Sequence, residues 1–163
     1  MKIAVTGHRP RSLGWGYDYN HPKYYELGRK LRDVLKENNA THAISGMALG
    51  VDTVFAMVVL KLRNTGILDV KLECAIPCSN QSSRWLENSV KLYNKILGEA
   101  DKVTFVSKTA YTPQCMQRRN EYMVNNCDLL IAVWNGSPGG TKNCVDYARR
   151  LNKKIIYINP REC

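Results

Sequence analysis

Polar and glycine residues that can bind a phosphate group follow three of the short apolar runs in this chain. After the first run come Gly7, His8 and Arg9. Glycine allows the backbone to turn close to a ligand, while histidine and arginine side chains donate hydrogen bonds to phosphate oxygens. These residue types in succession predict contacts with an anionic ligand.

A turn of small residues, Ser45 to Asp52, follows the second apolar run and leads directly into a helical pattern. The first N–H groups of a helix have no internal partners, so this helix start would form an anion site. Asp52 would lie in the first helical turn, where it either caps the helix or binds a ligand hydroxyl. We expect ligand contacts from Ser45, Gly46, Met47, Ala48, Gly50 and Asp52.

A second glycine-rich turn, Trp134 to Thr141, follows the fifth apolar run and also leads into a helix. From it we expect ligand contacts by Asn135, Gly139, Gly140 and Thr141. Neither turn has the GxxxxGK[ST] spacing of a P-loop, and no GxGxxG dinucleotide fingerprint follows the first run. Tight turns and helix caps that hold no ligand are the alternative interpretation of both segments.

A basic segment with helical spacing precedes the fifth apolar run. Met116, Asn120 and Met123 would share one helix face, with Arg119 beside it. An arginine at a helix start near the sheet edge can clamp phosphate with two parallel hydrogen bonds. We expect Arg119 and Asn120 to contact the ligand; the alternative is a solvated basic helix face.

Short β-type runs alternate with helical patterns from end to end and would position these residues. The six runs, mostly apolar as in strands covered on both faces, are residues 3–6, 43–45, 72–76, 103–106, 129–133 and 155–158. The helical patterns are residues 24–35, 51–62, 85–96, 118–126 and 141–151. This alternation predicts an α/β, Rossmann-like fold with a mainly parallel sheet of about six strands flanked by helices. Ligands bind such a sheet beyond the carboxyl ends of its strands.

Length and composition favour one Rossmann-like domain, residues 1–163. The net charge of +10 would attract nucleic acid or small phosphorylated ligands, and the basic residues are scattered rather than gathered in one tract. No apolar run approaches the ~20 residues that span a bilayer. The N-terminus enters a strand-like run at once, so we expect a cytoplasmic protein without a membrane partner.

Six cysteines and three histidines raise the question of disulfides or metal. The chain has no CxxC pair, and no histidine lies near a cysteine cluster, so we expect reduced thiols, no metal site and no cofactor. Residues 8–22 form the most irregular stretch. A loop of that length in a compact domain is often functional, and an inert surface excursion is the alternative.

Together these residues resemble the SLOG superfamily, which includes the lonely-guy phosphoribohydrolases and the Rossmann-like domain of the DNA-processing protein DprA. The turn Ser45 to Asp52 is similar to the SGxAxGxD turn of that superfamily. The YpsA-like branch is the most similar, on the further residues Pro77, Gln81, Trp85, Arg119, Asn120, Met123, Val124, Gly139, Gly140 and Thr141. The resemblance covers essentially the whole chain. It implies a nucleotide-binding cleft and a homo-oligomer.

The lonely-guy enzymes cleave the N-glycosidic bond of a nucleoside monophosphate, and their patterns include MHxRKxxM and PGGxGTxxE. Here Gln117 and Asn120 replace the His and Lys of the first pattern. At the glutamate of the second, one alignment places Asp146 and another places Cys144. A carboxylate there stabilises an oxocarbenium-like centre or activates water, so the resemblance implies Arg119 and Asp146 as candidate catalytic residues.

Three functions fit these observations, and the first is the leading hypothesis. Phosphate-cradling turns beside an incomplete catalytic pattern favour a protein that binds a nucleotide-derived small molecule, such as ADP-ribose or a cyclic relative, as a sensor or a sequestering sponge. A phosphoribohydrolase is the second, with Arg119 holding phosphate and Asp146 or Glu121 supplying the carboxylate. Single-stranded nucleic-acid binding is the third, suggested by the charge and the resemblance to DprA.

Overall fold

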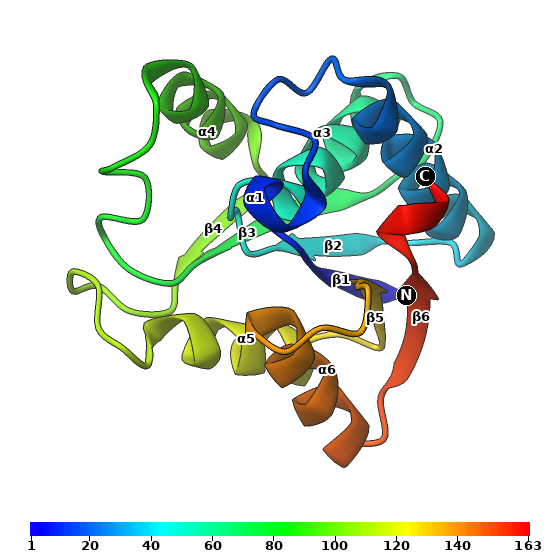
Figure 1. The fold of residues 1–163 in the computed structure, drawn as a ribbon. Helices are drawn as coiled ribbons and strands as arrows, with labels where there is room; N and C mark the ends of the chain where they lie inside the picture. The colour runs from blue at the N-terminus through cyan, green and yellow to red at the C-terminus, as the bar shows by residue number, and fades with distance from the viewer.

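Six parallel strands form one sheet, in the order β4-β3-β2-β1-β5-β6, in a computed structural model that describes residues 1–163 (Figure 1). The strands are β1 (Lys2–Gly7), β2 (His42–Ser45), β3 (Lys71–Ile76), β4 (Lys102–Phe105), β5 (Leu129–Val133) and β6 (Lys154–Ile158). Each strand lies on one of the six runs predicted from the sequence. The α/β, Rossmann-like class is confirmed.

Helices cover both faces of the sheet (Figure 1). From β1 to β4 the chain steps across the sheet in one direction, and right-handed crossovers place three helices on one face. After β4 the chain crosses to the opposite face, where one helix leads back to β5 beside β1 and a second helix joins β5 to β6. The first layer comprises α2 (Pro22–Glu37), α3 (Val51–Asn64) and α4 (Glu87–Glu99), and the second comprises α5 (Cys115–Asn125) and α6 (Gly140–Arg150).

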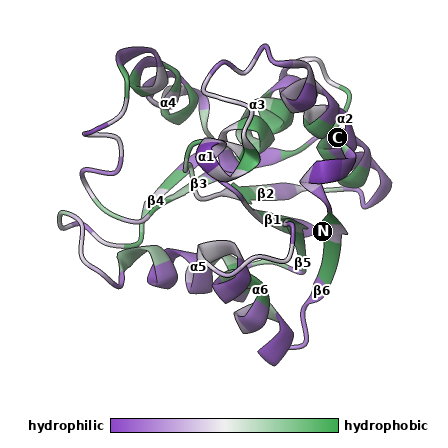
Figure 2. Ribbon diagram, in the orientation of Figure 1, coloured by the Kyte–Doolittle hydropathy of each residue, from purple (hydrophilic) through white to green (hydrophobic).

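The larger part of the core lies between the sheet and the first helical layer. In α2 the fully buried Leu27, Leu31 and Leu35 recur every four residues and so form one apolar stripe. Helix α3 is apolar nearly all round because it packs on the sheet between α2 and α4. Figure 2 shows hydrophobic residues concentrated in α3 and the strands, whereas most of the α6 ribbon has the hydrophilic colour.

The irregular segment 8–22 is folded against the first helical layer. It contains the short helix α1 (Pro10–Leu13), and its Trp15 side chain packs edge-on to Tyr24 of α2 with ring centroids 5.1 Å apart. The Tyr24 hydroxyl donates to the Gly16 carbonyl at 2.6 Å. Aromatic packing and hydrogen bonding therefore hold this segment near the carboxyl edge of the sheet.

Two predicted helix boundaries differ from the structure. Trp85 precedes α4, because the helix begins at Glu87. The sequence predicted Arg119 at the start of its helix. Helix α5 begins at Cys115, so Arg119 lies in its second turn. A single 3-10 turn, Pro160–Glu162, follows β6. None of the helices is both long enough and apolar enough to cross a membrane.

Candidate ligand-binding site at the carboxyl edge of the sheet

A cavity of about 350 Å³ lies where β1 and β5 are neighbours in the sheet. The chain leaves these two strands toward helices on opposite faces, which opens a crevice beyond their carboxyl ends. We call this space the switch-point cavity. Its lining residues are Thr6, Gly7, His8, Arg9, Ser12, Ala48, Asp52, Met116, Arg119, Asn120, Met123, Ser137, Pro138, Gly139, Gly140 and Thr141.

Most of the predicted ligand-binding residues line this cavity. They come from the segment after β1, the start of α3, helix α5 and the start of α6, and they are Gly7, His8, Arg9, Ala48, Asp52, Arg119, Asn120, Gly139, Gly140 and Thr141. The predicted residues that do not line it are Ser45, Gly46, Met47, Gly50 and Asn135. Two of them contact residues that do line it: Asn135 N bonds to His8, and the Gly46 carbonyl accepts from Arg119.

The turn Ser45 to Asp52 does not present the open row of N–H groups that the sequence suggested. Three of its N–H groups already have acceptors within the protein: Met47 N donates to Ser45 Oγ at 3.2 Å, Ala48 N to Asp52 Oδ2 at 3.2 Å, and Gly50 N to the Tyr19 hydroxyl at 2.9 Å. In addition, the first N–H of α3, at Val51, donates to the His8 carbonyl at 3.3 Å. These donors hold the fold together and are not free for a ligand.

Gly46 leaves room for the Arg119 side chain and not for a ligand phosphate. Its carbonyl accepts hydrogen bonds from Arg119 Nη1 and from Gln81 Nε2, the latter at 3.0 Å. A Cβ atom at this position would lie only 2.7 Å from Arg119 Cζ. A side chain at Gly46 would therefore displace the guanidinium.

Arg119 is buried, and part of its hydrogen-bonding capacity is free. Its Nε donates to Asn120 Oδ1 at 3.0 Å, and its Nη1 donates to Gly46. Its Nη2 reaches only the sulfur of Met116, at 3.8 Å, which is a weak acceptor. The guanidinium is thus fixed in place and keeps one edge available for an anion in the cavity.

Asp52 is the carboxylate of the switch-point cavity, and it lies on the opposite side of the sheet from α5. It is 5% exposed, as is Arg119, and no direct ion pair joins the two side chains. Burial raises the pKa of Asp52, and the charge of Arg119 opposes this shift. Burial also lowers the pKa of Arg119, although an arginine stays protonated in proteins. The cavity therefore holds an acceptor and a cation that leave space between them.

His8 links the two sides of the cavity. Its Nε2 accepts a hydrogen bond from Asn135 N at 3.1 Å, so this nitrogen carries no proton and the ring is neutral. Burial lowers the pKa of His8 below the ordinary value. Asn135 thus acts by orienting His8, and His8 offers a neutral side chain instead of a second positive charge.

The start of α6 is open to the cavity, in contrast to the start of α3. Gly139 caps the helix with φ 137°, and no side chain bonds to the first N–H groups. A Cβ atom at either Gly139 or Gly140 would meet no other atom within 4 Å, so this backbone faces empty space. Helix starts of this kind carry free N–H groups and partial positive charge. They line the same cavity as Arg119 and the exposed Arg9, so hydrogen-bond donors and positive charge gather there.

Asp146 and Arg119 are not brought together. Asp146 lies five residues after Thr141, about 7.5 Å further along α6, and pairs with Lys142 at 2.6 Å. It lines a separate surface hollow with Gln117, Asn143, Arg149 and Arg150. Cys144, the other residue aligned with the family glutamate, is completely buried. Of the two candidate catalytic residues, Arg119 therefore lines the switch-point cavity and Asp146 does not.

Some residues of the cavity were not singled out as ligand contacts from the sequence. Met116 and Met123 share the face of α5 that carries Asn120, so the helical period alone could have placed them there. Ser137 and Pro138 belong to the glycine-rich turn after β5. Ser12 lies in α1, and no motif in the sequence marks it.

Comparison with known proteins supports the sequence resemblance. The family model YpsA, described as the YspA SLOG family, matches residues 3–162. The SPbeta prophage-derived protein YoqJ of Bacillus subtilis is 29% identical over 159 residues, covering 86% of this chain and 91% of its own. A UPF0398 protein of Bacillus cereus is 32% identical over 154 residues, covering 91% of this chain and 82% of its own.

Two solved structures of the DNA-processing protein DprA share the fold. The Helicobacter pylori protein, described with a single-stranded DNA binding mode, superposes with a TM-score of 0.66 at 19% identity, covering 98% of this chain. The Streptococcus pneumoniae protein superposes with a TM-score of 0.65 at 17% identity, covering 97%. The chain spans 65% of the first DprA chain and 50% of the second. The family match over nearly every residue leads to one conclusion: the chain belongs to the YpsA-like SLOG family.

Proposed function

We propose that the protein binds the phosphate group of a nucleotide-derived small molecule in the switch-point cavity. The observation that carries this proposal is the buried Arg119, whose Nη2 has only a thioether partner and which lines the same cavity as the uncapped start of α6. A phosphate between them would gain charge-assisted hydrogen bonds from the guanidinium and from the backbone. It would also offset a buried positive charge that no carboxylate pairs directly.

Asp52 gives the cavity a second recognition element. Its Oδ2 accepts from Ala48 N, whereas its Oδ1 accepts no hydrogen bond within the protein. A ribose hydroxyl could donate to this free oxygen while the phosphate lies toward Arg119. An acceptor and a cation on opposite sides of one cavity fit a ribose phosphate, and ADP-ribose or a cyclic relative contains that unit.

Binding without cleavage is the function that this geometry favours. The family alignment with the lonely-guy enzymes assigns the catalytic carboxylate to Asp146, which lies outside the cavity and is paired with Lys142. A hydrolase would have to use Asp52 instead. Chromatography that measures the release of free base from AMP, by wild type and by Asp52→Asn, separates the two functions. If base is released and the release depends on Asp52, the protein is a hydrolase and the proposal of binding alone fails.

Single-stranded nucleic acid is the second candidate ligand, on the strength of the net charge of +10 and of the Helicobacter pylori DprA structure. Nucleic-acid binding releases counterions from each neutralised phosphate, so its affinity falls steeply with salt. Filter binding of an oligonucleotide at two salt concentrations tests this alternative. A steep salt dependence combined with no small-molecule binding would favour nucleic acid.

Calorimetry tests the leading proposal with ribose 5-phosphate, AMP, ADP-ribose and cyclic ADP-ribose. Arg119→Ala should weaken binding about 10- to 100-fold, as expected for the loss of charged hydrogen bonds. The matched control is Arg32→Ala, which removes an exposed arginine of α2 that forms only a surface pair with Asp33. No binding of any of the four compounds at millimolar concentration would refute the proposal.

The homo-oligomer implied by the family resemblance belongs to this proposal as well. The two edge strands of the sheet carry half-exposed aromatic side chains, Phe105 on β4 and Tyr157 on β6. An oligomer that covers either edge would bury such a ring. Light scattering of wild type, Phe105→Ser and Tyr157→Ser tests whether an oligomer forms and whether it covers either edge. The variant at the covered edge should dissociate, and a monomeric wild type would contradict the proposed oligomer.

A further inference from the structure

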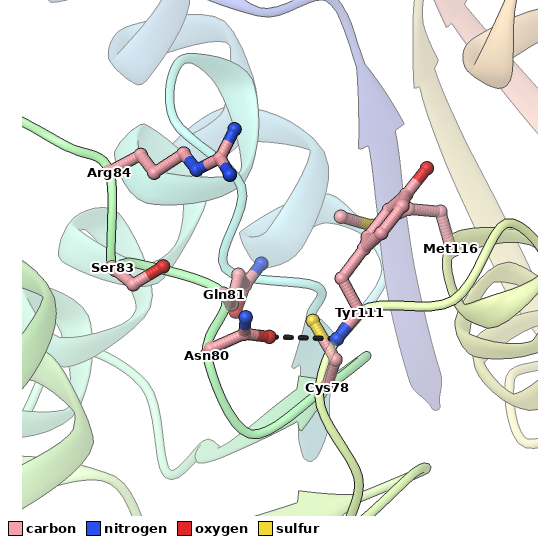
Figure 3. Close-up of a pocket in the computed structure, with 7 residues that line it drawn as sticks. All are labelled: Cys78, Asn80, Gln81, Ser83, Arg84, Tyr111 and Met116. Carbon is pink, nitrogen blue, oxygen red and sulfur yellow. Dashed lines mark hydrogen bonds between the residues drawn. The ribbon is translucent and has the colours of Figure 1, made fainter.

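A second cavity of about 300 Å³ adjoins the switch-point cavity, and we call it the flanking cavity. Figure 3 shows its lining residues, which are Cys78, Asn80, Gln81, Ser83, Arg84, Tyr111 and Met116. Met116 lines both cavities. A third hollow, which includes Arg9, Ala48, Gln81 and Met116, lies between them and shares residues with each. The three hollows therefore lie next to one another along the carboxyl edge, from the start of α6 to the loops after β3 and β4.

The walls of the flanking cavity are loops, but hydrogen bonds fix them to each other. Tyr111 N donates to Asn80 Oδ1 at 2.8 Å, and Ser79 N donates to the Thr109 carbonyl, also at 2.8 Å. These bonds join the loop after β3 to the loop after β4. A binding site whose walls are already joined loses less conformational entropy when a ligand enters.

Gln81 connects the flanking cavity to the phosphate site. Its Nε2 donates to the Gly46 carbonyl at 3.0 Å, the same carbonyl that accepts from Arg119. Its Oε1 accepts from the Tyr93 hydroxyl at 3.0 Å. Both ends of the amide are therefore occupied, which fixes Gln81 at the side of the flanking cavity and ties it to the carbonyl that holds Arg119.

The remaining polar groups of the flanking cavity are free. Asn80 Nδ2, the Ser83 hydroxyl and the Arg84 guanidinium make no hydrogen bond within the protein, whereas Asn80 Oδ1 is used by Tyr111. Tyr111 is 60% exposed. In Figure 3 the Tyr111 ring and the Arg84 side chain lie on opposite sides of the cavity, with Asn80 and Ser83 below them.

A flat ring, a guanidinium and free donors around one small space are the groups that bind a nucleobase. Resting on the phosphate site proposed above, we propose that the flanking cavity binds the purine base of the same ligand. Tyr111 stacks on the face of the base, and Arg84 and Asn80 donate to its ring nitrogens. Ser83 can accept from an exocyclic amine.

Calorimetry with three compounds separates the base from the phosphate: ribose 5-phosphate, adenosine and AMP. Wild type should bind AMP about 5- to 100-fold more tightly than ribose 5-phosphate, the range expected for stacking of one base on an aromatic ring. In Tyr111→Ala this advantage of AMP should disappear, while the affinity for ribose 5-phosphate stays unchanged. Tyr111→Phe should keep the advantage, because it retains the ring.

Tyr25→Ala is the matched control, since Tyr25 is 77% exposed and lies on α2, away from the cavity. An equal advantage of AMP in wild type and Tyr111→Ala would overturn the inference and leave the phosphate site standing. Binding of adenosine and AMP that depends on Tyr111, with no binding of ribose 5-phosphate, would support the base site and refute the phosphate site. No binding of any of the three compounds would overturn both.

Discussion

The start of α3 and the start of α6 are both reached through a glycine-rich turn after a parallel strand, and they differ in what their N–H groups contact. In the turn before α3, Ser45 Oγ, Asp52 Oδ2 and the Tyr19 hydroxyl already accept the hydrogen bonds. In the turn before α6 no side chain caps the helix, and the backbone of Gly140 faces the cavity. Two turns of similar composition can therefore serve different purposes, one structural and one open to a ligand.

The largest effect that distinguishes the two turns should come from adding one methyl group to each. Gly50→Ala should reduce the free energy of unfolding by roughly 2–5 kcal/mol, because φ is 91° and the new Cβ would lie 2.6 Å from the His8 carbonyl. Gly140→Ala is the matched variant: its Cβ meets nothing, so stability should hold while affinity for ribose 5-phosphate falls. Denaturant unfolding and calorimetry measure both, and equal loss of stability in the two variants would contradict the distinction.

A second prediction concerns Gly46 and its indirect effect on the ligand. Gly46→Ala should push the Arg119 guanidinium out of place and weaken ribose 5-phosphate binding about 10-fold, as the loss of a charged hydrogen bond would. In the double variant with Arg119→Ala, the Gly46 substitution should add almost nothing, because its effect acts through Arg119. Fully additive losses in the calorimetric cycle would mean that Gly46 contacts the ligand itself.

Acid should loosen the α6 side of the cavity before the α3 side, through His8. Because burial lowers the pKa of His8, the unfolded chain binds this proton more readily than the folded protein. Its contribution to stability is full above the ordinary pKa of about 6.5 and is lost as pH falls toward the lower folded-state pKa, with a slope of at most about 1.4 kcal/mol per pH unit. Protonation breaks the bond from Asn135 N, whereas the bond from Val51 N goes to the His8 carbonyl and survives.

Hydrogen exchange at the Asn135 and Val51 amides follows the two sides separately between pH 7 and pH 5. Exchange at Asn135, corrected for its intrinsic pH dependence, should accelerate on acidification more than exchange at Val51. In His8→Gln this difference should vanish, since glutamine does not titrate. Parallel changes at both amides in wild type would remove His8 as the link between the two turns.

The smallest effect is expected at Asp146, which lies on α6 but outside the cavity. Asp146→Asn removes a surface pair with Lys142, so both the free energy of unfolding and the affinity for ribose 5-phosphate should be nearly unchanged. Asp52→Asn is the informative partner, because it alters the free Oδ1 inside the cavity. A loss of affinity in Asp146→Asn comparable to that in Asp52→Asn would place the ligand along α6 and not at its start.

The strands and most helices were predictable because their signals are local. Residues 129–133 are apolar throughout, and Leu27, Leu31 and Leu35 repeat at the helical period. The cavity could be located for a similar reason, since it follows from the alternation of strands and helices. The difference between the two turns could not be predicted, because Tyr19, which accepts from Gly50, comes from a distant irregular segment. The place of Asp146 outside the cavity was missed for another reason: the motif gives its distance along the chain, but not which residues of α6 face the cavity.

The most direct test of the central claim is a titration of the isotope-labelled protein with ribose 5-phosphate, followed by amide NMR. If the phosphate binds at the start of α6, the largest shifts should appear at Gly140 and Thr141, with a further change at the Arg119 side-chain Nε. The amides of Met47 and Gly50 should move less, because their hydrogen bonds end within the protein. Largest shifts at Met47 to Gly50, with Gly140 and Thr141 unmoved, would contradict this assignment of the phosphate site.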